Sequence, residues 1–281
     1  MFIFLDGRIL DEKDAVISVL DRGFLFGDGL FETMRAYNGR VFLLSEHLER
    51  LEASAKELEL GIGYSKEELS EAIYEVLRAN NLKEARIRLS LSRGRFSGRV
   101  EYDGCEKGMV VVSAVVVEEK KELMELSLVR SGLRLSRDYV LARHKTLSYL
   151  PYLYALRQAR RGGADEGLLL SEDGKVLEGS RANLFMLKED RLITPGLGLP
   201  ILPGITRRKV MELGKELGLL VEEAEFGEEE IFESEAVFLT NSIMEVGLVR
   251  SYEGRVIGGR RGKELVRNLW RLYQEQARSN G

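Results

Sequence analysis

The sequence predicts an α+β protein with two domains. Segments with helical periodicity and segments with strand-like composition follow one another along its 281 residues. A hydrophobic content of 44% is sufficient for two medium-sized cores. Residues 118–122 (EEKKE) are charged throughout, so we expect an interdomain linker at 119–123. This linker separates a small N-terminal α+β domain, residues 1–118, from a larger C-terminal domain, residues 124–281.

The first domain begins with a strand, a turn and a second strand in residues 2–10 (FIFLDGRIL). Residues 45–60 place apolar side chains on one helical face, and Ser45 is suited to cap that helix. A second helix starts at Ser65, and Glu68 completes a capping box with it. Both helices therefore have an apolar face for the domain core.

Two further strands are expected at residues 85–92 and 109–117. The first alternates arginine with aliphatic residues, so Arg86 and Arg88 share one face while the aliphatic side chains point into the core. The second is nearly all β-branched, which predicts a strand buried on both faces.

The second domain also mixes strands and helices. Strands are expected at residues 126–130, 167–170, 183–187, 191–194 and 236–240, and helices at residues 149–161, 206–217 and 263–277. Gly218 has the position of a glycine that ends a helix. The last strands form a hairpin that turns at Glu253 and Gly254.

Composition excludes several classes of function. A formal net charge of -4, with both signs mixed along the chain, does not favour nucleic-acid binding. One cysteine and two histidines make a metal site improbable on composition. The N-terminus lacks the features of a signal peptide. No uncharged apolar run approaches the roughly 20 residues of a membrane span. We therefore expect a cytoplasmic protein that needs no metal and binds neither nucleic acid nor a membrane.

Six short motifs carry a resemblance that composition does not provide. They are DRGFLFGDGLFET (21–33), HLERL (47–51), HKTLSYL (144–150), EGSRANLF (178–185), PGITR (203–207) and TNSIMEV (240–246). In this order and spacing they resemble the class IV aminotransferases, the fold type IV enzymes of pyridoxal 5'-phosphate (PLP). The resemblance implies two α+β domains with the cofactor between them. It also implies a homodimer whose small-molecule partners are an amino acid and a keto acid.

The same resemblance assigns the residues that hold the cofactor. Lys145 matches the family lysine, whose amine holds the PLP aldehyde and later moves a proton. Glu178 matches the carboxylate that keeps the pyridine nitrogen protonated. Tyr149 matches the tyrosine that binds the cofactor's 3-oxygen. Arg50 matches the arginine that pairs with the phosphate.

Two loops are expected to complete the phosphate site. PGITR places a glycine turn before a helix, so the amides of Ile205 and Thr206 can point at a phosphate. The Thr206 hydroxyl is a further donor, although it could equally cap the helix. Asn241 and Ser242 lie in a tight turn that resembles the family's other phosphate-binding loop.

The substrate carboxylate calls for an arginine, because a guanidinium can bind it with two parallel hydrogen bonds. Arg88 matches the strand arginine of branched-chain enzymes, and Arg86 could share its role. Other candidates lie in loops of both domains. The full set of expected substrate residues is Phe31, Arg86, Arg88, Arg95, Arg99 and Arg181.

The family includes several activities that the sequence leaves open. A length of 281 residues resembles D-amino acid aminotransferases and aminodeoxychorismate lyases more than branched-chain enzymes. We expect an aminotransferase with a preference for D-amino acids. The alternatives are an aminodeoxychorismate lyase, then a branched-chain L-amino acid aminotransferase, and last a relative without catalysis.

Overall fold

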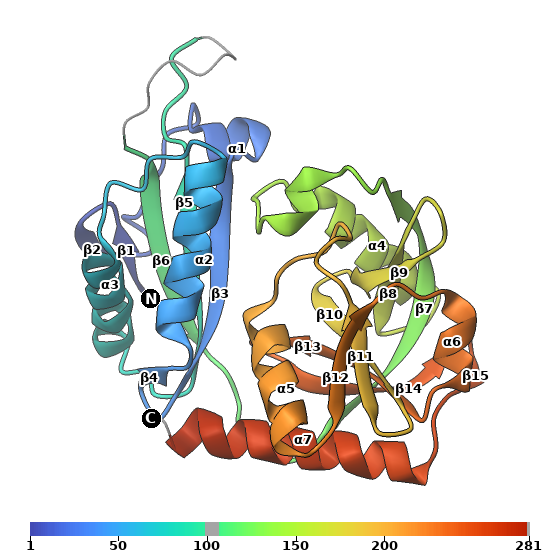
Figure 1. The fold of residues 1–281 in the computed structure, drawn as a ribbon. Helices are drawn as coiled ribbons and strands as arrows, with labels where there is room; N and C mark the ends of the chain where they lie inside the picture. Colours follow the sequence, from blue (N-terminus) through green and yellow to red (C-terminus); the bar gives the residue numbers. More distant parts are fainter. Residues whose placement is uncertain (99–106, 280–281) are drawn as a thin grey trace. The chain divides into compact units, whose positions relative to one another are not determined.

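The computed structural model describes residues 1–98 and 107–279. The chain divides into two compact units (Figure 1). The first unit contains Met1–Glu119, the short segment His144–Tyr149 and the C-terminal residues from Ala277. The second contains Lys120–Arg143 and Leu150–Gln276. The domain ranges 1–118 and 124–281 stay a prediction, and six residues from His144 return to the first unit.

A six-stranded antiparallel sheet forms the first unit. Its strand order is β2-β1-β6-β5-β3-β4. The strands are β1 (Phe2–Leu5), β2 (Arg8–Asp11), β3 (Gly29–Tyr37), β4 (Arg40–Val41), β5 (Ala85–Ser92) and β6 (Met109–Val116). A short helix, α1 (Arg22–Phe26), precedes β3. Helices α2 (Leu44–Glu57) and α3 (Lys66–Ala79) bury their apolar faces against one side of the sheet.

The positions of helices α2 and α3 largely agree with those predicted from the sequence. Ser65 and Glu68 form the expected capping box at the start of α3. The prediction for α2 is wrong at its start, because the helix begins at Leu44 after Leu43, whose φ is 55°. The Ser45 hydroxyl instead donates to Glu49 within the helix.

The expectation that the β6 strand is buried on both faces is also wrong. Val110, Val112 and Ala114 are buried against the helices, whereas the intervening residues are not. Val115 is 37% exposed and Val116 is 71% exposed. The sheet is antiparallel, and helices α2 and α3 pack against the face that carries Val110, Val112 and Ala114. The β-branched residues of β6 therefore reflect strand propensity more than two-sided burial.

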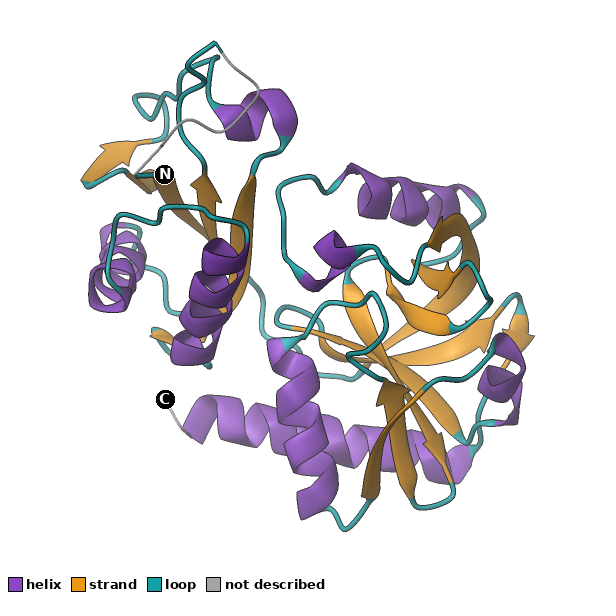
Figure 2. Ribbon diagram, turned by 45° about the horizontal axis from the view of Figure 1, so that its top comes forward, coloured by secondary structure: helices purple, strands orange, loops and turns teal. Residues whose placement is uncertain are grey.

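The second unit contains a nine-stranded mixed sheet (Figure 2). Its order is β12-β11-β10-β13-β14-β7-β8-β9, with β15 paired to β14. The strands are β7 (Met124–Leu135), β8 (Glu166–Ser171), β9 (Val176–Gly179), β10 (Ala182–Lys188), β11 (Arg191–Pro195), β12 (Leu220–Ala224), β13 (Ala236–Asn241), β14 (Glu245–Tyr252) and β15 (Arg255–Val256). The helices are η1 (Val140–Arg143), α4 (Leu150–Arg161), α5 (Ile205–Glu216), α6 (Glu228–Glu233) and α7 (Arg260–Ser279).

Helices of the second unit pack on particular strands. α4 contacts β7 and β8, and α5 contacts β12 and β13. Gly218, with φ of 78°, follows the end of α5 as expected. The hairpin between β14 and β15 turns through Glu253 and Gly254, which both have positive φ. The β13–β14 turn follows the buried strand β13, and α5 begins at Ile205 after the segment that follows β11.

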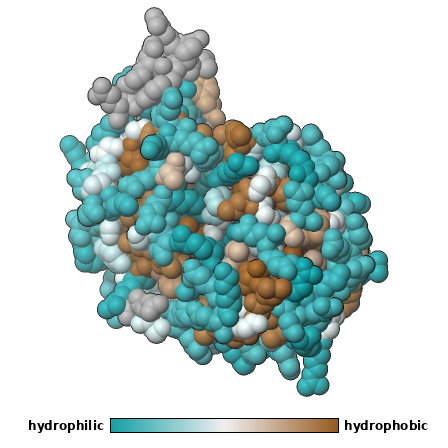
Figure 3. Space-filling view, viewed as in Figure 1, coloured by the Kyte–Doolittle hydropathy of each residue, from teal (hydrophilic) through white to brown (hydrophobic). Residues whose placement is uncertain are grey.

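The surface in Figure 3 is mainly hydrophilic and carries separate apolar patches. Across the described residues, none of the helices combines the length and the apolar character that a membrane span needs.

Candidate active site

The segment that carries Lys145 extends the sheet of the first unit. The Phe31 N–H donates to the Lys145 carbonyl, and the Leu147 N–H donates to the Gly29 carbonyl, both at 2.8 Å. Thr146 forms an isolated antiparallel bridge with Leu30. The segment therefore forms a short strand beside the N-terminal end of β3. On the same edge, β4 pairs only with the C-terminal end of β3. This pairing fixes the backbone of Lys145 to β3.

The Lys145 amine lies in an aromatic setting. Its Nζ is 4.4 Å from the centre of the Phe31 ring and 5.8 Å from that of Tyr149. The two rings meet edge to face, with 5.4 Å between their centres. The guanidinium carbon of Arg88 lies 3.8 Å from the centre of the Phe31 ring. Four of the expected site residues thus share one neighbourhood within the first unit.

Arg86 and Arg88 lie on the same face of β5, as the alternation predicts, with buried aliphatic residues between them. Arg88 Nε donates to the Ser90 hydroxyl at 3.1 Å. Neither arginine forms an ion pair with a carboxylate in the described part of the chain. Partial burial and the neighbouring charge of Arg86 lower the pKa of Arg88, against an opposing contribution from Tyr149. This pair of cations suits an anionic ligand.

The other face of β3 holds a buried cluster that sequence reasoning missed in part. Glu32 is 1% exposed. It accepts hydrogen bonds from Arg50 Nε at 2.8 Å and Arg50 Nη2 at 2.6 Å, and lies 2.7 Å from His47 Nδ1. His47 and Arg50 are three residues apart on α2, so they share a helix face.

Electrostatics fixes the charge state of this cluster. Burial alone would raise the pKa of Glu32, but Arg50 and His47 outweigh it and lower the pKa to about 2. Burial lowers the pKa of His47, although Glu32 opposes that shift. The bidentate pair holds the Arg50 guanidinium in one orientation. The sequence does contain a signal for this cluster. His47 lies three residues before Arg50 in HLERL, and the first motif supplies a glutamate, Glu32, as their partner.

Two expected arginines, Arg95 and Arg99, follow β5 in the sequence. Arg95 is exposed and forms an isolated backbone bridge with Asp21. Arg99 lies outside the described residues. Neither position tests the expected role in substrate binding.

In the second unit, Glu178 is a buried carboxylate on β9 with amide donors around it. It accepts a hydrogen bond from Asn183 Nδ2 at 2.9 Å, and the Leu202 N–H lies 3.3 Å from both of its oxygens. Asn183 also donates to the Leu202 carbonyl. A buried carboxylate held in this way can stabilise a protonated ring nitrogen.

The start of α5 provides the expected anion-binding geometry. Gly204 precedes the helix and makes no side-chain capping bond. A Cβ at Gly204 would lie 1.9 Å from Asn183 Oδ1, so this turn has no room for a side chain. Ile205 and Thr206 are buried in the first turn. Backbone N–H groups at a helix start bind phosphate without a side-chain contribution.

The β13–β14 turn is shaped by its own side chains. Asn241 Oδ1 accepts from the N–H groups of Ile243 at 3.0 Å and Met244 at 2.7 Å. Its Nδ2 donates to the Arg181 carbonyl at 3.1 Å. The side chain of Asn241 therefore sets the conformation of the turn in which Ser242 lies.

Arg181 is an ion-paired residue in the second unit. Its Nε donates to Glu166 at 2.9 Å, and Glu166 is buried. The Ser180 hydroxyl and N–H donate to the same carboxylate. Much of the charge of Arg181 is thus already balanced within the protein.

The donor and acceptor types of these residues fit PLP. Within the first unit, the amine of Lys145 suits the aldehyde of PLP. Within the second unit, the buried carboxylate of Glu178 suits the ring nitrogen, and the helix start after Gly204 suits the phosphate.

The chain belongs to the class IV aminotransferase family. The family model "Amino-transferase class IV" matches residues 29–252. The family interpretation of the sequence, the α+β fold, the assignment as an enzyme and the PLP cofactor are therefore confirmed.

Relatives with different printed activities resemble the chain along nearly all of its length. A putative branched-chain-amino-acid aminotransferase of Methanocaldococcus jannaschii is 37% identical over 98% of this chain and 96% of the relative. An aminodeoxychorismate lyase of Bacillus subtilis is 34% identical over 99% and 95%. A D-alanine aminotransferase of Bacillus licheniformis is 29% identical over 98% and 96%.

Solved structures of branched-chain aminotransferases also resemble the chain along nearly all of its length. The branched-chain aminotransferase of Thermoproteus uzoniensis with norvaline has a TM-score of 0.91 and 30% identity, and the match covers 99% of this chain and 94% of that one. The branched-chain amino acid aminotransferase from Escherichia coli has a TM-score of 0.91 and 29% identity, covering 99% and 94%.

Proposed function

We propose that this chain is an aminotransferase that moves an amino group from an aliphatic L-amino acid to a 2-keto acid. The observation that carries the proposal is the placement of Arg88. It lies on a strand, over the Phe31 ring that also contacts Lys145, and has no acidic partner in the described residues. A strand-held guanidinium without a counter-ion suits the carboxylate that every amino acid and keto acid carries.

Lys145 is the residue that moves the proton. PLP, when bound, supplies an electron-withdrawing ring that weakens the Cα–H bond of an attached amino acid. Lys145 Nζ would accept the proton from the substrate Cα and deliver it to the former aldehyde carbon of the cofactor, and the backbone bonds to β3 hold the Lys145 backbone in place. The rings of Phe31 and Tyr149 lie beside this amine.

The other site residues bind and orient. Glu178, which accepts hydrogen bonds from Asn183 and from the Leu202 N–H, would hold a proton at the ring nitrogen of the cofactor. Arg50, oriented by Glu32, and the start of α5 at Thr206 are assigned to the phosphate.

The proposed substrates rest on two arginines of β5, Arg88 and Arg86, and on the sequence identities to relatives of named activity. Arg88 matches the strand arginine of branched-chain enzymes, and the putative branched-chain relative is 37% identical against 29% for the D-alanine aminotransferase. We therefore propose L-amino acids in place of the D-amino acids that chain length had favoured. Arg86, two residues along the same face, supports a dicarboxylic keto acid as the amino acceptor.

We also propose that the chain works as a homodimer. A run of apolar residues in the first unit is exposed in the single chain, which is typical of a surface that a partner covers. The run contains Val16, Ile17, Val19, Leu20, Phe24, Leu25 and Phe26. Sedimentation of the purified protein tests this proposal, and a monomer at micromolar concentration would contradict it.

A substrate panel tests the activity. The protein is incubated with PLP and 2-oxoglutarate together with L-leucine, L-valine, D-alanine or D-leucine, and separately with aminodeoxychorismate. We expect glutamate to form from the L-aliphatic donors at rates at least about tenfold above those with the D-donors. Faster turnover of D-alanine would restore the D-amino acid preference. Release of 4-aminobenzoate and pyruvate as the main reaction would identify a lyase.

A further inference from the structure

We propose that the glycines of the first motif form a seat that sets the backbone register of the Lys145 segment. The seat consists of Gly23, Gly27 and Gly29. These are positioning residues, since they contact the segment and not the reacting atoms. The inference rests on the proposed role of Lys145, and it assigns a physical task to the glycines of a motif whose Phe31 and Glu32 already belong to the site.

Gly27 and Ser148 approach too closely for any side chain at Gly27. A Cβ there would lie 2.6 Å from Ser148 Oγ and 3.1 Å from the backbone N and Cα of Ser148. Gly27 also has φ of 69°, which strongly favours glycine. The Ser148 hydroxyl donates to the Gly27 carbonyl at 3.2 Å. The close approach of Ser148 to Gly27 and the hydrogen bond to the Gly27 carbonyl therefore both fix this contact.

Leu147 fills the space over the other two glycines. A Cβ at Gly29 would lie 2.7 Å from Leu147 Cδ1 and 2.3 Å from the Leu91 carbonyl oxygen. A Cβ at Gly23 would lie 3.1 Å from the same Leu147 methyl. The Leu147 side chain therefore occupies space that is available only because Gly23 and Gly29 have no side chains.

This fit determines which side chain meets Phe31. The backbone bonds place Lys145 opposite Phe31 and Leu147 opposite Gly29. Neighbouring side chains of a strand point to opposite faces, so a slip by one residue would turn Lys145 away from Phe31 and bring Thr146 there. Two backbone hydrogen bonds alone specify the register weakly, whereas a leucine that fits only over glycine specifies it strongly.

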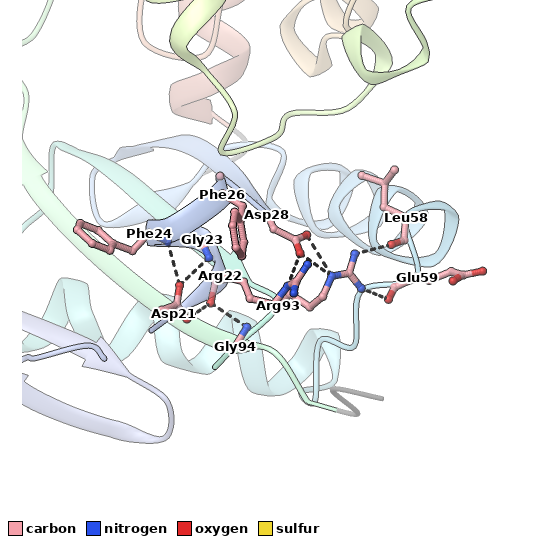
Figure 4. Close-up of polar contacts among 12 residues, drawn as sticks. Asp21, Arg22, Gly23, Phe24, Phe26, Asp28, Leu58, Glu59, Arg93 and Gly94 are labelled. Carbon is pink, nitrogen blue, oxygen red and sulfur yellow. Dashed lines mark hydrogen bonds and ion pairs between the residues drawn. The ribbon is translucent and has the colours of Figure 1, made fainter. Parts of the chain in front are cut away.

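Hydrogen bonds to the carboxylates of Asp21 and Asp28 hold α1 and the neighbouring glycines of the seat in place (Figure 4). Asp21 accepts from the Gly23 N–H at 2.8 Å and from the Phe24 N–H at 3.3 Å. Asp28 binds Arg22 Nε at 2.7 Å and Arg93 Nε at 2.9 Å. These bonds tie both ends of the glycine segment to the unit.

Arg93 links Asp28 to the end of α2. Its two terminal nitrogens donate to the Glu59 carbonyl at 2.6 Å and the Leu58 carbonyl at 2.9 Å (Figure 4). Arg93 is therefore a structural residue, in contrast to the exposed arginines of β5.

Gly27→Ala tests the seat, with Gly39→Ala as the matched control. Gly39 also has positive φ, 82°, and lies in the first unit, but a Cβ there meets no atom within 4 Å. Both substitutions introduce similar backbone strain, and only Gly27→Ala presses on Ser148. Hydrogen exchange of the Phe31 and Leu147 amides in the full-length protein reports the pairing of the Lys145 segment directly, without reference to activity.

We expect both amides to exchange at least about tenfold faster in Gly27→Ala and to keep their wild-type rates in Gly39→Ala. In the PLP-loaded enzyme, kcat should fall by about tenfold or more in Gly27→Ala, while KM for the keto acid changes little. Unchanged amide exchange in Gly27→Ala, or an equal change in Gly39→Ala, would overturn the proposal.

Leu147→Ala provides a second test in case Gly27→Ala does not fold. It removes the side chain that fills the space over Gly23 and Gly29 and adds no strain, so the same two amides should again exchange faster. Wild-type exchange in Leu147→Ala would overturn the proposal as well. Failure of the proposed function is distinguishable, because PLP found on another lysine would remove the role of Lys145 and leave the exchange data unaffected.

Discussion

The buried Glu32 cluster should make the first unit sensitive to acid in the absence of PLP. In the folded protein the pKa of Glu32 lies at about 2, against an ordinary value of 4.5. A folded pKa below the unfolded pKa means that ionised Glu32 stabilises the fold. This contribution is complete above pH 4.5 and is lost as the pH falls through about 2.

The magnitude follows from the pKa values. The full contribution of Glu32 is about 3 kcal/mol, of which about 2 kcal/mol disappears between pH 5 and pH 3. His47 acts in the same direction, because burial lowers its pKa and the folded protein resists its protonation. The double variant Glu32→Gln/His47→Gln removes both titrating groups, so its stability should depend less on pH.

Native-state hydrogen exchange of core amides in β5, such as that of Ile87, measures the opening free energy of the first unit alone. The wild-type protein should be the more stable of the two at pH 5. The difference from the double variant should shrink by at least about 2 kcal/mol at pH 3. Opening free energies that run parallel between pH 5 and pH 3 would refute the assignment of an ionised, stabilising Glu32.

Four further substitutions probe the cofactor and substrate residues. Glu178→Gln should keep the fold and slow proton removal from Cα by about 10- to 100-fold, as expected for a charge-assisted hydrogen bond of roughly 1.5–3 kcal/mol; unchanged turnover would exclude the role. Arg88→Leu should raise KM for the amino donor by two to three orders of magnitude, on the order of 3–4 kcal/mol. Arg181→Leu, its matched control, should change that KM only a few-fold, on the order of 1 kcal/mol, and the reverse pattern would move the carboxylate anchor to the second unit. Gly204→Ala should weaken PLP binding about tenfold or more, by at least roughly 1.4 kcal/mol, in a fluorescence titration, and wild-type affinity would contradict the close approach at that turn.

Local patterns were sufficient to predict much of the secondary structure. The capping box of Ser65 and Glu68 and the alternation in β5 are encoded by residues two to three positions apart. β3 was not predicted, because almost all of its residues are buried and charged Glu32 and Arg35 interrupt its apolar character. Without alternation there was no periodic signal to read.

The candidate site depends on contacts that no local pattern contains. The six residues from His144 belong to the first unit although the residues on both sides belong to the second. The pairing of Lys145 with Phe31 joins positions more than a hundred residues apart. The motifs suggested residue types and roles, whereas the partners of Arg50, Arg181 and Asn241 became visible only in the fold.

The covalent site of PLP tests the central claim most directly. The purified protein is loaded with PLP, reduced with borohydride and digested, and the pyridoxyl-modified peptide is identified by mass spectrometry. We predict a single modified lysine, Lys145, and no modification of that peptide in Lys145→Ala. A pyridoxyl group on a different lysine of the wild-type protein, or PLP-dependent transamination by Lys145→Ala at the wild-type rate, would contradict the account.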